Sequence, residues 1–340
     1  MNSKHGLCWG LFLNIVLFGT LTGLSLTTWT GGGIDTKVTT PENWDNGVPN
    51  NSSNPGIVGT GGIVSWGNRL DLNYRGITFT NNAKLIASVE LRPSSAVLTF
   101  NDASQFSQGG NQDLKLWGNS TITLNDTATL SSKNIYAYNA GNNRLNLNGG
   151  SQVSASGYID LAQTSGNIFT LAGGKVSASD YFTASSSSYF NFTSTSTGIM
   201  QKNSANYVNN FTTLITNGAI RINGVVQADT KYFIMSYSGG NTTLTLGSAH
   251  LPSVAVAPTE VTVVSGNTLT LTATPAGAAP YYFQWYTNGV AIANATSNPL
   301  VYPDVKWAGN WSVTLTNAYG SASASSVVTI LPRGTMISFQ

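Results

Sequence analysis

Residues 98–102 read Leu-Thr-Phe-Asn-Asp, and segments of the same type follow: Ile-Thr-Leu-Asn-Asp at 122–126, Leu-Asn-Leu-Asn-Gly at 145–149 and Phe-Thr-Leu-Ala-Gly at 169–173. Their first residues lie 24, 23 and 24 positions apart. Each segment begins with an apolar-polar-apolar triplet, which places two side chains on one face of a short strand, and then enters a turn. One strand and one turn therefore recur in every period of about 23 residues.

Further short strands are expected in each period. An apolar residue follows each turn, at Phe106, Leu130, Val153 and Val176, and another short triplet comes later, before the next segment of the repeat. The triplets are 114–116, 136–138, 159–161 and 182–184. Several short strands per period, with no 3.6-residue periodicity between them, are typical of a parallel β-helix, and a propeller blade needs about twice this period. The pattern continues less regularly at 70–72, 77–79, 190–192 and 220–222. It predicts an all-β fold with a right-handed parallel β-helix over residues 26–250, of about eight coils and roughly 40 Å in length.

Asn101, Asn125 and Asn148 occupy one position of successive coils. Amide side chains in register can hydrogen-bond along the stack, as they do in cross-β assemblies. Asparagine also suits the backbone of a turn without any such bond. Both interpretations of this structural column remain open at this stage.

The composition supports an all-β secreted protein. Only 8% of the 340 residues are charged, the formal net charge is +2, and the Lys and Arg residues are scattered. Nucleic acid binding requires a concentrated basic surface, so a nucleic acid partner is not expected. The length allows two domains that each bury a core.

Residues 1–25 have the pattern of a signal peptide. Lys4 precedes an apolar run from Leu7 to Leu24, and small residues follow it. The run approaches the length that spans a bilayer, so an uncleaved anchor is the alternative and the only expected membrane contact. Cys8, the single cysteine, lies in this segment. The rest of the chain is therefore expected outside the cytoplasm, secreted or at the cell surface, without a disulfide or a cysteine metal site.

The last part of the chain changes character after a predicted linker at 251–258. Alternating strands with Gly, Asn and Pro turns fill 259–332, and 333–340 is a predicted tail. Gln284-Trp285-Tyr286, with the turn at 288–289, and Trp311 after Ala308-Gly-Asn resemble the core tryptophan strand and the corner of an immunoglobulin-like domain. The resemblance implies a β-sandwich around Trp285 and Trp311.

This chain departs from the immunoglobulin pattern at three positions. The usual cysteines are replaced near Leu271 and at Val313, and the corner tyrosine is replaced by Trp311. Apolar packing must therefore replace the disulfide, and we expect a weaker sandwich than in bridged relatives.

The beginning of the predicted β-helix shows a second resemblance. Trp-Thr-Gly-Gly-Gly at 29–33, Glu-Asn-Trp at 42–44 and the later Leu-x-Leu-x-Gly-Gly segments look like those of bacterial autotransporter-type passengers and related pectin-lyase-like β-helical surface proteins. The resemblance spans about residues 27–250 and implies a bacterial cell-surface protein. Because one fold hosts many activities, it implies little about function.

Asp102 and Asp126 are the candidate catalytic pair. They occupy one position of adjacent coils, which places their carboxyl groups about 5 Å apart, as glycoside hydrolysis requires. Aspartate is also favoured in turns for backbone reasons, and no basic or histidine cluster accompanies the pair. His5 lies in the signal segment, and His250 is expected as a solvated loop residue. No metal, cofactor or phosphate motif is present in the sequence, so neither a metal site nor a cofactor is predicted.

Tyr136, Tyr158 and Tyr181 recur every 22 or 23 residues and predict an aromatic column. Such a column stabilises coils from within or binds sugar rings outside, and the register alone does not decide between these roles. The leading hypothesis is a secreted or cell-surface structural or adhesive protein, not an enzyme, that binds glycans or other surface proteins. A polysaccharide-degrading lyase or glycosidase is the alternative. A fibre-forming component, whose exposed coil ends template further strands, is a third hypothesis.

Overall fold

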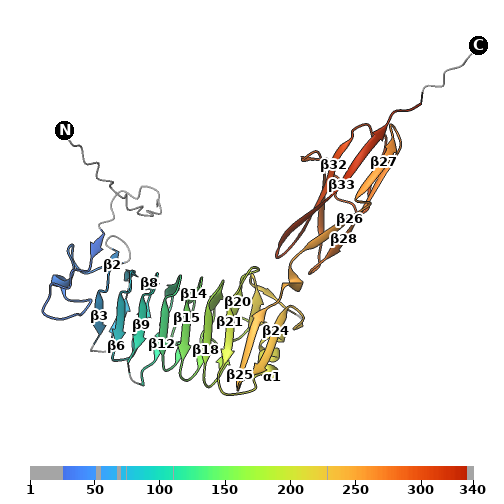
Figure 1. Ribbon diagram of the computed structural model, residues 1–340. Coiled ribbons are helices and arrows are strands. Elements are labelled where there is room, and N and C mark those ends of the chain that lie inside the picture. The colour runs from blue at the N-terminus through green and yellow to red at the C-terminus, as the bar shows by residue number, and fades with distance from the viewer. Residues whose placement is uncertain are drawn as a thin grey trace, which may run out of the picture.

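A computed structural model describes residues 26–50, 55–66, 70–73, 75–109, 111–227 and 229–334. The predicted signal peptide and most of the predicted tail lie outside these described residues. The described chain forms a stack of coils followed by a two-sheet sandwich that extends from one end of the stack (Figure 1).

Three sheets run along the stack, and each coil contributes one strand to each sheet. The first sheet consists of β1 (Thr27–Thr28), β2 (Gly56–Val58), β5 (Gly76–Phe79), β8 (Val97–Phe100), β11 (Thr121–Leu124), β14 (Arg144–Leu147), β17 (Ile168–Leu171), β20 (Tyr189–Phe192), β22 (Ile220–Ile222) and β23 (Val225–Val226). The second consists of β3 (Ile63–Trp66), β6 (Lys84–Ala87), β9 (Gln105–Gln108), β12 (Thr129–Ser132), β15 (Gln152–Ala155), β18 (Lys175–Ala178), β21 (Ile199–Lys202), β25 (Asn241–Leu246) and β24 (Phe233–Ser238). The third consists of β4 (Leu70–Asn73), β7 (Leu91–Ser94), β10 (Leu114–Leu116), β13 (Ile135–Ala137), β16 (Ile159–Asp160) and β19 (Phe182–Thr183).

The coils are parallel and in register. Ile122 of β11 pairs with Leu98 on one side and Leu145 on the other, and Phe169 follows in β17. This confirms the predicted β-helix and its period. The number of coils was overestimated, because only six coils contain all three strands: β20 and β21 begin a seventh, in which helix α1 (Val208–Thr216) replaces the third strand.

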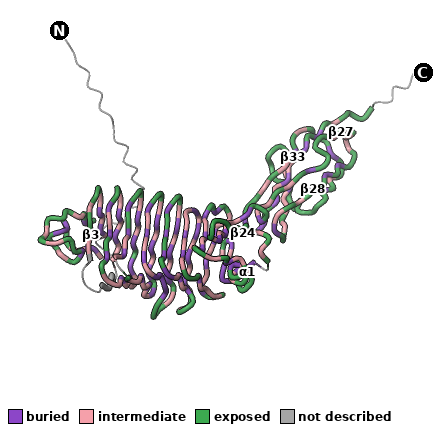
Figure 2. Tube along the Cα trace, turned by 60° about the horizontal axis from the view of Figure 1, so that its bottom comes forward, coloured by how far each residue is buried: buried purple, intermediate pink, exposed green. Residues whose placement is uncertain are grey.

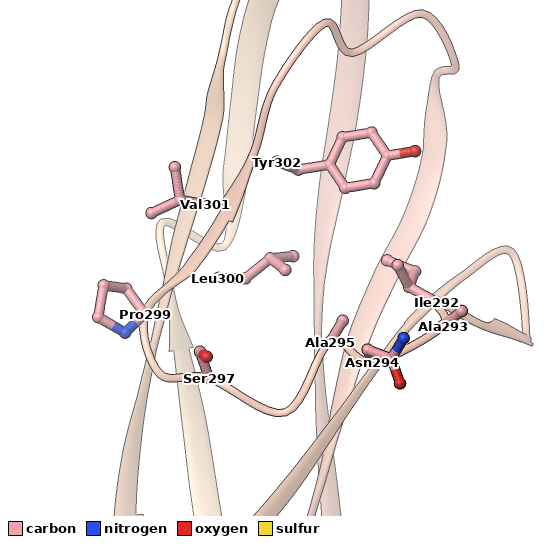
Figure 3. Close-up of a pocket in the computed structure, with 9 residues that line it drawn as sticks. All are labelled: Ile292, Ala293, Asn294, Ala295, Ser297, Pro299, Leu300, Val301 and Tyr302. Atoms are coloured by element: carbon pink, nitrogen blue, oxygen red, sulfur yellow. The ribbon is translucent and has the colours of Figure 1, made fainter.

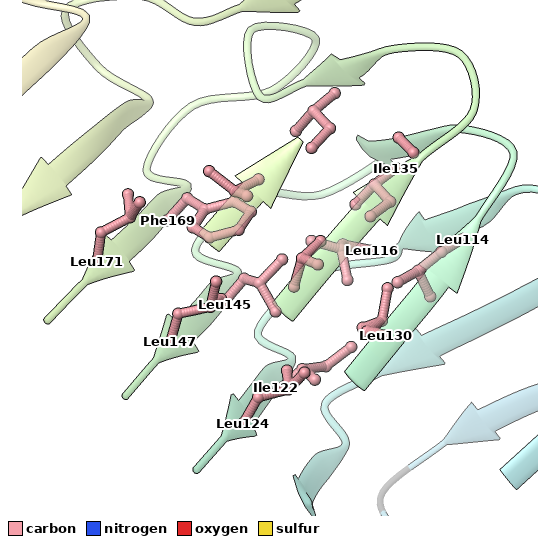
Figure 4. Close-up of a cluster of buried hydrophobic side chains, with 14 of the residues drawn as sticks. Leu114, Leu116, Ile122, Leu124, Leu130, Ile135, Leu145, Leu147, Phe169 and Leu171 are labelled. Carbon is pink, nitrogen blue, oxygen red and sulfur yellow. The ribbon is translucent and has the colours of Figure 1, made fainter. Parts of the chain in front are cut away.

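The two apolar side chains of each triplet fill the interior of the stack. Figure 4 shows Ile122 and Leu124, Leu145 and Leu147, and later residues of the first sheet above one another, opposite side chains of the other two sheets. Phe79 and Phe100 stack with ring centroids 4.7 Å apart and an interplanar angle of 5°. The alternation of buried and less buried residues continues along every coil (Figure 2). Burial of each such side chain stabilises the fold by about 1.5–3 kcal/mol.

Both ends of the stack are covered. At the first end, Trp44 after the short helix η1 (Pro41–Asn43) packs edge-on against Trp29 at 5.2 Å and donates from its indole nitrogen to the Val38 carbonyl. At the other end, α1 buries Phe211 against Phe182 at 5.8 Å. Trp44 and Phe211 therefore shield the apolar interior of the stack at its two ends.

Two sheets form the sandwich. β26 (Ser253–Ala257), β28 (Leu269–Ala276) and β31 (Leu300–Tyr302) form one sheet, and β27 (Glu260–Val264), β33 (Gly320–Leu331), β32 (Gly309–Asn317), β29 (Tyr282–Thr287) and β30 (Val290–Ala291) form the other. Trp285 and Trp311 are fully buried in the core, together with Leu271 and Val313, which stand at the usual cysteine positions. Apolar packing thus occupies the site of the missing bridge. The segment expected as a linker, 251–258, instead contains β26, which pairs with β28.

Candidate functional site

The outward positions of the three sheets differ in chemistry. On the first sheet one column contains hydroxyl and amide side chains, at Thr78, Thr99, Thr123, Asn146, Thr170 and Asn191. On the second sheet a column of serines runs through Ser107, Ser131, Ser154 and Ser177. The third sheet and its flanking turns instead collect aromatic and charged side chains, which makes this face the strongest candidate for binding.

Of the three predicted tyrosines, Tyr158 and Tyr181 occupy equivalent positions before β16 and β19. The predicted column is wrong at Tyr136, which pairs with Asp160 and therefore contacts Tyr158 diagonally. The rings of Tyr158 and Tyr181 are parallel, with centroids 4.9 Å apart, and Tyr136 lies 5.8 Å from Tyr158 at 40°. Tyr136 is 7% exposed, whereas Tyr181, beside the last strand of the sheet, is 40% exposed. Burial raises the pKa of Tyr136, and of the other two phenols, so all three stay protonated at neutral pH. Tyr136 is therefore structural, and the column is accessible at Tyr181.

A second aromatic pair flanks the other side of the third sheet. Trp117 and Tyr138 lie 5.2 Å apart, and Tyr138 is 41% exposed. The Arg92 guanidinium lies 4.8 Å from the Trp117 ring centroid. We call Trp117, Tyr136, Tyr138, Tyr158 and Tyr181 together the aromatic face.

A small charge cluster fixes the geometry of this face. Glu90 pairs with Arg92 and, at 2.6 Å, with Lys115. The Lys115 ammonium lies 5.4 Å from the Tyr136 ring and 5.3 Å from the Tyr138 ring. Burial opposes the charge on Lys115 and is the largest single influence on it, but the hydrogen bonds and charge interactions with Glu90 and Tyr136 together exceed it and raise the pKa of Lys115. Lys115 is thus a permanent cation that holds the two rings together.

A polar groove of about 320 Å³ borders the tyrosine column. Ser156 and Ser179 line it, and each precedes a column tyrosine by two residues. Lys133 and Asn203 also contribute to its wall. Hydroxyl, amide and ammonium groups therefore lie next to exposed aromatic surface.

The candidate catalytic pair has a structural role in the turns. Both Asp102 and Asp126 adopt positive φ, near 55°. The Asp102 carboxylate accepts hydrogen bonds from the Thr80 hydroxyl at 2.6 Å and the Asn81 amide at 3.0 Å, and the Asp126 carboxylate accepts from the Asp102 amide at 3.1 Å. The Thr80 and Asn81 bonds lower the pKa of Asp102. Each carboxylate thus ties its coil to the preceding one, and an ionised Asp102 is poorly suited to act as a general acid.

Asn101, Asn125 and Asn148 form a hydrogen-bonded ladder. The side-chain amide of Asn125 donates to Asn101, and that of Asn148 donates to Asn125, each at 2.7 Å. Of the two interpretations left open by the sequence, the structure shows the ladder.

Asn125→Asp should destabilise the solenoid by about 1–3 kcal/mol, because the variant loses the donor to Asn101 and places an anion beside that carbonyl oxygen. Urea unfolding of wild type and variant measures the difference. Asn146→Asp, on the outer face of the next coil with a longer 3.3 Å bond to Thr123, is the control and should cost much less. Equal losses would show that the ladder adds nothing.

His250 does not lie in solvent as expected. Its side chain is 1% exposed, its Nε2 lies 2.7 Å from the Ser194 carbonyl, and the Tyr319 ring packs edge-on against it at 5.2 Å. It belongs to the junction between solenoid and sandwich. Among the described residues, no group of three or more His, Cys, Asp or Glu side chains is arranged to hold a metal ion.

The sandwich has a hollow of its own, of about 480 Å³, between β30 and β31. Figure 3 shows its lining, in which Ile292, Leu300 and Tyr302 are the largest apolar groups. The nine lining residues include no charged side chain. Across the part of the chain that the structure describes, no helix is long and apolar enough to cross a membrane.

No family model matches the chain, and no curated protein matches it. Among solved structures, the four N-terminal Ig domains of Dscam1 isoform 1.9 match at 24% identity and a TM-score of 0.23, over 28% of this chain and 25% of that one. The tandem Ig repeats of Dlar match at 12% identity and 0.23, over 31% and 78%. The twitchin kinase fragment of C. elegans matches at 16% and 0.23, over 27% and 24%. The chain thus spans about a quarter of the Dscam1 structure, and similarity at this level carries no argument about function.

Proposed function

We propose that this chain is a secreted or cell-surface adhesive protein that binds extracellular glycan chains along the aromatic face. The observation that carries the proposal is the pair of exposed rings, Tyr138 and Tyr181, on the same sheet of a rigid solenoid. Tyr138 follows β13 and Tyr181 precedes β19, so the two rings lie at opposite ends of the strands of this sheet and two coils, or about 10 Å, apart along the stack. An oligosaccharide that runs obliquely across the sheet can contact both rings.

The surrounding chemistry suits a sugar. The C–H faces of a sugar ring pack on aromatic rings, and its hydroxyl groups need nearby polar partners. The groove that contains Ser156 and Ser179 offers hydroxyl groups directly beside the column. Lys115 and Glu90 form an ion pair, so their charges largely cancel and the face does not select strongly for a charged glycan.

The location and the role of the sandwich belong to the same proposal. The signal-like residues 1–25 and the resemblance to bacterial autotransporter-type and pectin-lyase-like surface proteins support export. The sandwich would then serve as a spacer or attachment module beyond the binding solenoid. A protein partner on the cell surface is the competing ligand class.

Binding should weaken about tenfold or more in the Tyr138→Ala/Tyr181→Ala double variant, because two exposed stacking surfaces are removed. A glycan array identifies the tightest ligand, and calorimetric titration of that ligand measures the loss. Tyr237→Ala is the matched control, since Tyr237 is at least as exposed as Tyr138 and Tyr181 but lies on β24 of the second sheet. Equal affinity of all three proteins would place binding elsewhere.

The same preparation distinguishes adhesion from degradation. We expect the wild type to leave the bound polysaccharide at its original length. Depolymerisation that is lost in Asp102→Asn would overturn the proposal in favour of an enzyme that uses Asp102 and Asp126.

A further inference from the structure

The solenoid and the sandwich are joined by buried polar contacts. The Asn317 amide donates to the carbonyls of His250, at 3.1 Å, and Ala278, at 2.9 Å, and the Gln227 amide donates to the Tyr319 hydroxyl at 2.7 Å. All five of these residues are buried. Buried hydrogen bonds of this kind are costly to leave unpaired, so the two modules hold one arrangement.

A pocket of about 520 Å³ opens at this junction. The solenoid contributes Lys231 and Tyr232, from the turn before β24, and Ala249 of the short helix η2 (Ser248–His250). The sandwich contributes the loop between β28 and β29, with Gly277, Ala279 and Tyr281. Neither module alone forms this pocket.

Hydrogen bonds fix the backbone on both sides of the pocket. On the solenoid side, the Tyr232 carbonyl accepts from the Gly247 amide at 2.8 Å. On the sandwich side, the Ala278 amide donates to the His250 carbonyl, and the Tyr281 hydroxyl donates to the Gly277 carbonyl at 2.8 Å. The pocket is therefore largely formed before a ligand arrives, which lowers the entropic cost of binding.

Gly277 permits the close approach of the two modules. Its φ is +109°, and a Cβ atom at this position would lie 2.4 Å from the Leu251 carbonyl oxygen. A larger residue would push the sandwich loop away from Leu251. The small residues Gly277, Ala249 and Ala279 line the same pocket as the two tyrosines and take up little of its volume.

We propose that this pocket binds an acidic saccharide, with the carboxylate of a hexuronic acid at Lys231 and the sugar rings between Tyr232 and Tyr281. Two aromatic side chains and a lining of small residues suit a sugar, and one ammonium group suits a carboxylate. Lys231 pairs with Asp229 at 3.3 Å, but both side chains are more than half exposed. Such a pair is weak, and the Lys231 ammonium also lies 5.0 Å from the Tyr232 ring centroid, so a ligand carboxylate that replaces Asp229 would lie at the edge of this ring. The site shares no residue with the aromatic face.

Titration of the full chain with trigalacturonate tests the proposal, and its methyl ester is the matched uncharged probe. We expect trigalacturonate to bind and the ester to bind about threefold or more weakly. Lys231→Gln should remove this difference, and Tyr281→Ala should weaken both probes by roughly tenfold. Tyr282→Ala, the next residue along, is 64% exposed, does not line the pocket and should bind like the wild type.

Three outcomes would overturn the proposal: no binding of trigalacturonate, equal binding of acid and ester, or unchanged binding in both pocket variants. Because Tyr281→Ala can loosen its loop, the exposed Lys231→Gln variant provides a test that does not disturb folding. Tyr181→Ala separates this site from the aromatic face: it should leave trigalacturonate binding at the junction unchanged, whatever its effect on other glycans.

Discussion

Trp285→Ala is expected to destabilise the sandwich by about 3–5 kcal/mol, because it removes a large side chain from a core that has no disulfide. The Trp285 ring is fully buried, and its indole nitrogen donates to the Ser297 carbonyl at 2.9 Å. The strand partner of Trp285 is Val313, at a usual cysteine position. The cavity would therefore open at the point where a covalent bridge would otherwise hold the two sheets.

Scanning calorimetry of the full chain measures this effect. The core around Trp285 is separate from the solenoid core, which among the described residues of the sandwich only Ala278 and Tyr319 join. The sandwich should therefore unfold as its own transition, lowered by roughly 15 °C in Trp285→Ala. Trp307→Ala is the matched control, because Trp307 is more than half exposed. Similar shifts in the two variants would mean that the core does not depend on Trp285.

Phe100→Ala is expected to cost the solenoid about 3–5 kcal/mol. The fully buried Phe100 ring stacks on Phe79 of the preceding coil and lies 6.1 Å from Phe106 of the same coil. Loss of the ring leaves a cavity that rigid neighbouring coils fill poorly. Val97→Ala, on the outer face of the same strand, removes a smaller and exposed group and should cost little.

Hydrogen exchange locates the consequence of Phe100→Ala. In a solenoid each coil contacts only its neighbours, so amide protection should fall most in β5, β8 and β11 and remain unchanged in the sandwich. Protection lost evenly over the whole chain would contradict this local picture. The urea midpoint of the same variant gives the free energy.

The register of the solenoid could be predicted because the contacts repeat. When a chain returns to the same position every 23 or 24 residues, the residue above Ile122 is the one a period later, Leu145. The same rule places Asn101, Asn125 and Asn148 in one column, and Tyr158 and Tyr181 in another. It fails at Tyr136, because the period of this coil is 24 residues and its strand partner is Asp160. The partner of each repeated residue is thus encoded in the spacing.

Elements that interrupt the repeat were missed or misassigned. Helix α1 was not predicted, although Tyr207, Phe211 and Ile215 stand four residues apart, as one face of a helix requires. Its polar, uncharged and β-branched sequence resembles that of the neighbouring strands, which hid this signal. β26 was taken for linker because Pro252 and Pro258 flank it. β26 is recognised as a strand by its pairing with β28, which is a tertiary contact that the local sequence does not reveal.

The period of the sequence alone determines the β-helix and its asparagine column, because these contacts repeat at a constant spacing. The tryptophan core of the sandwich was expected only from the resemblance to an immunoglobulin-like domain. The sequence did not predict the exposure of Tyr181, the burial of His250 or the pocket at the junction. Tyr181 is exposed because its column ends with the third sheet, and His250 is buried because Tyr319, 69 residues later, packs against it. Such contacts do not repeat along the sequence, so no residue spacing predicts them. The contacts at the junction form only when the two modules pack together.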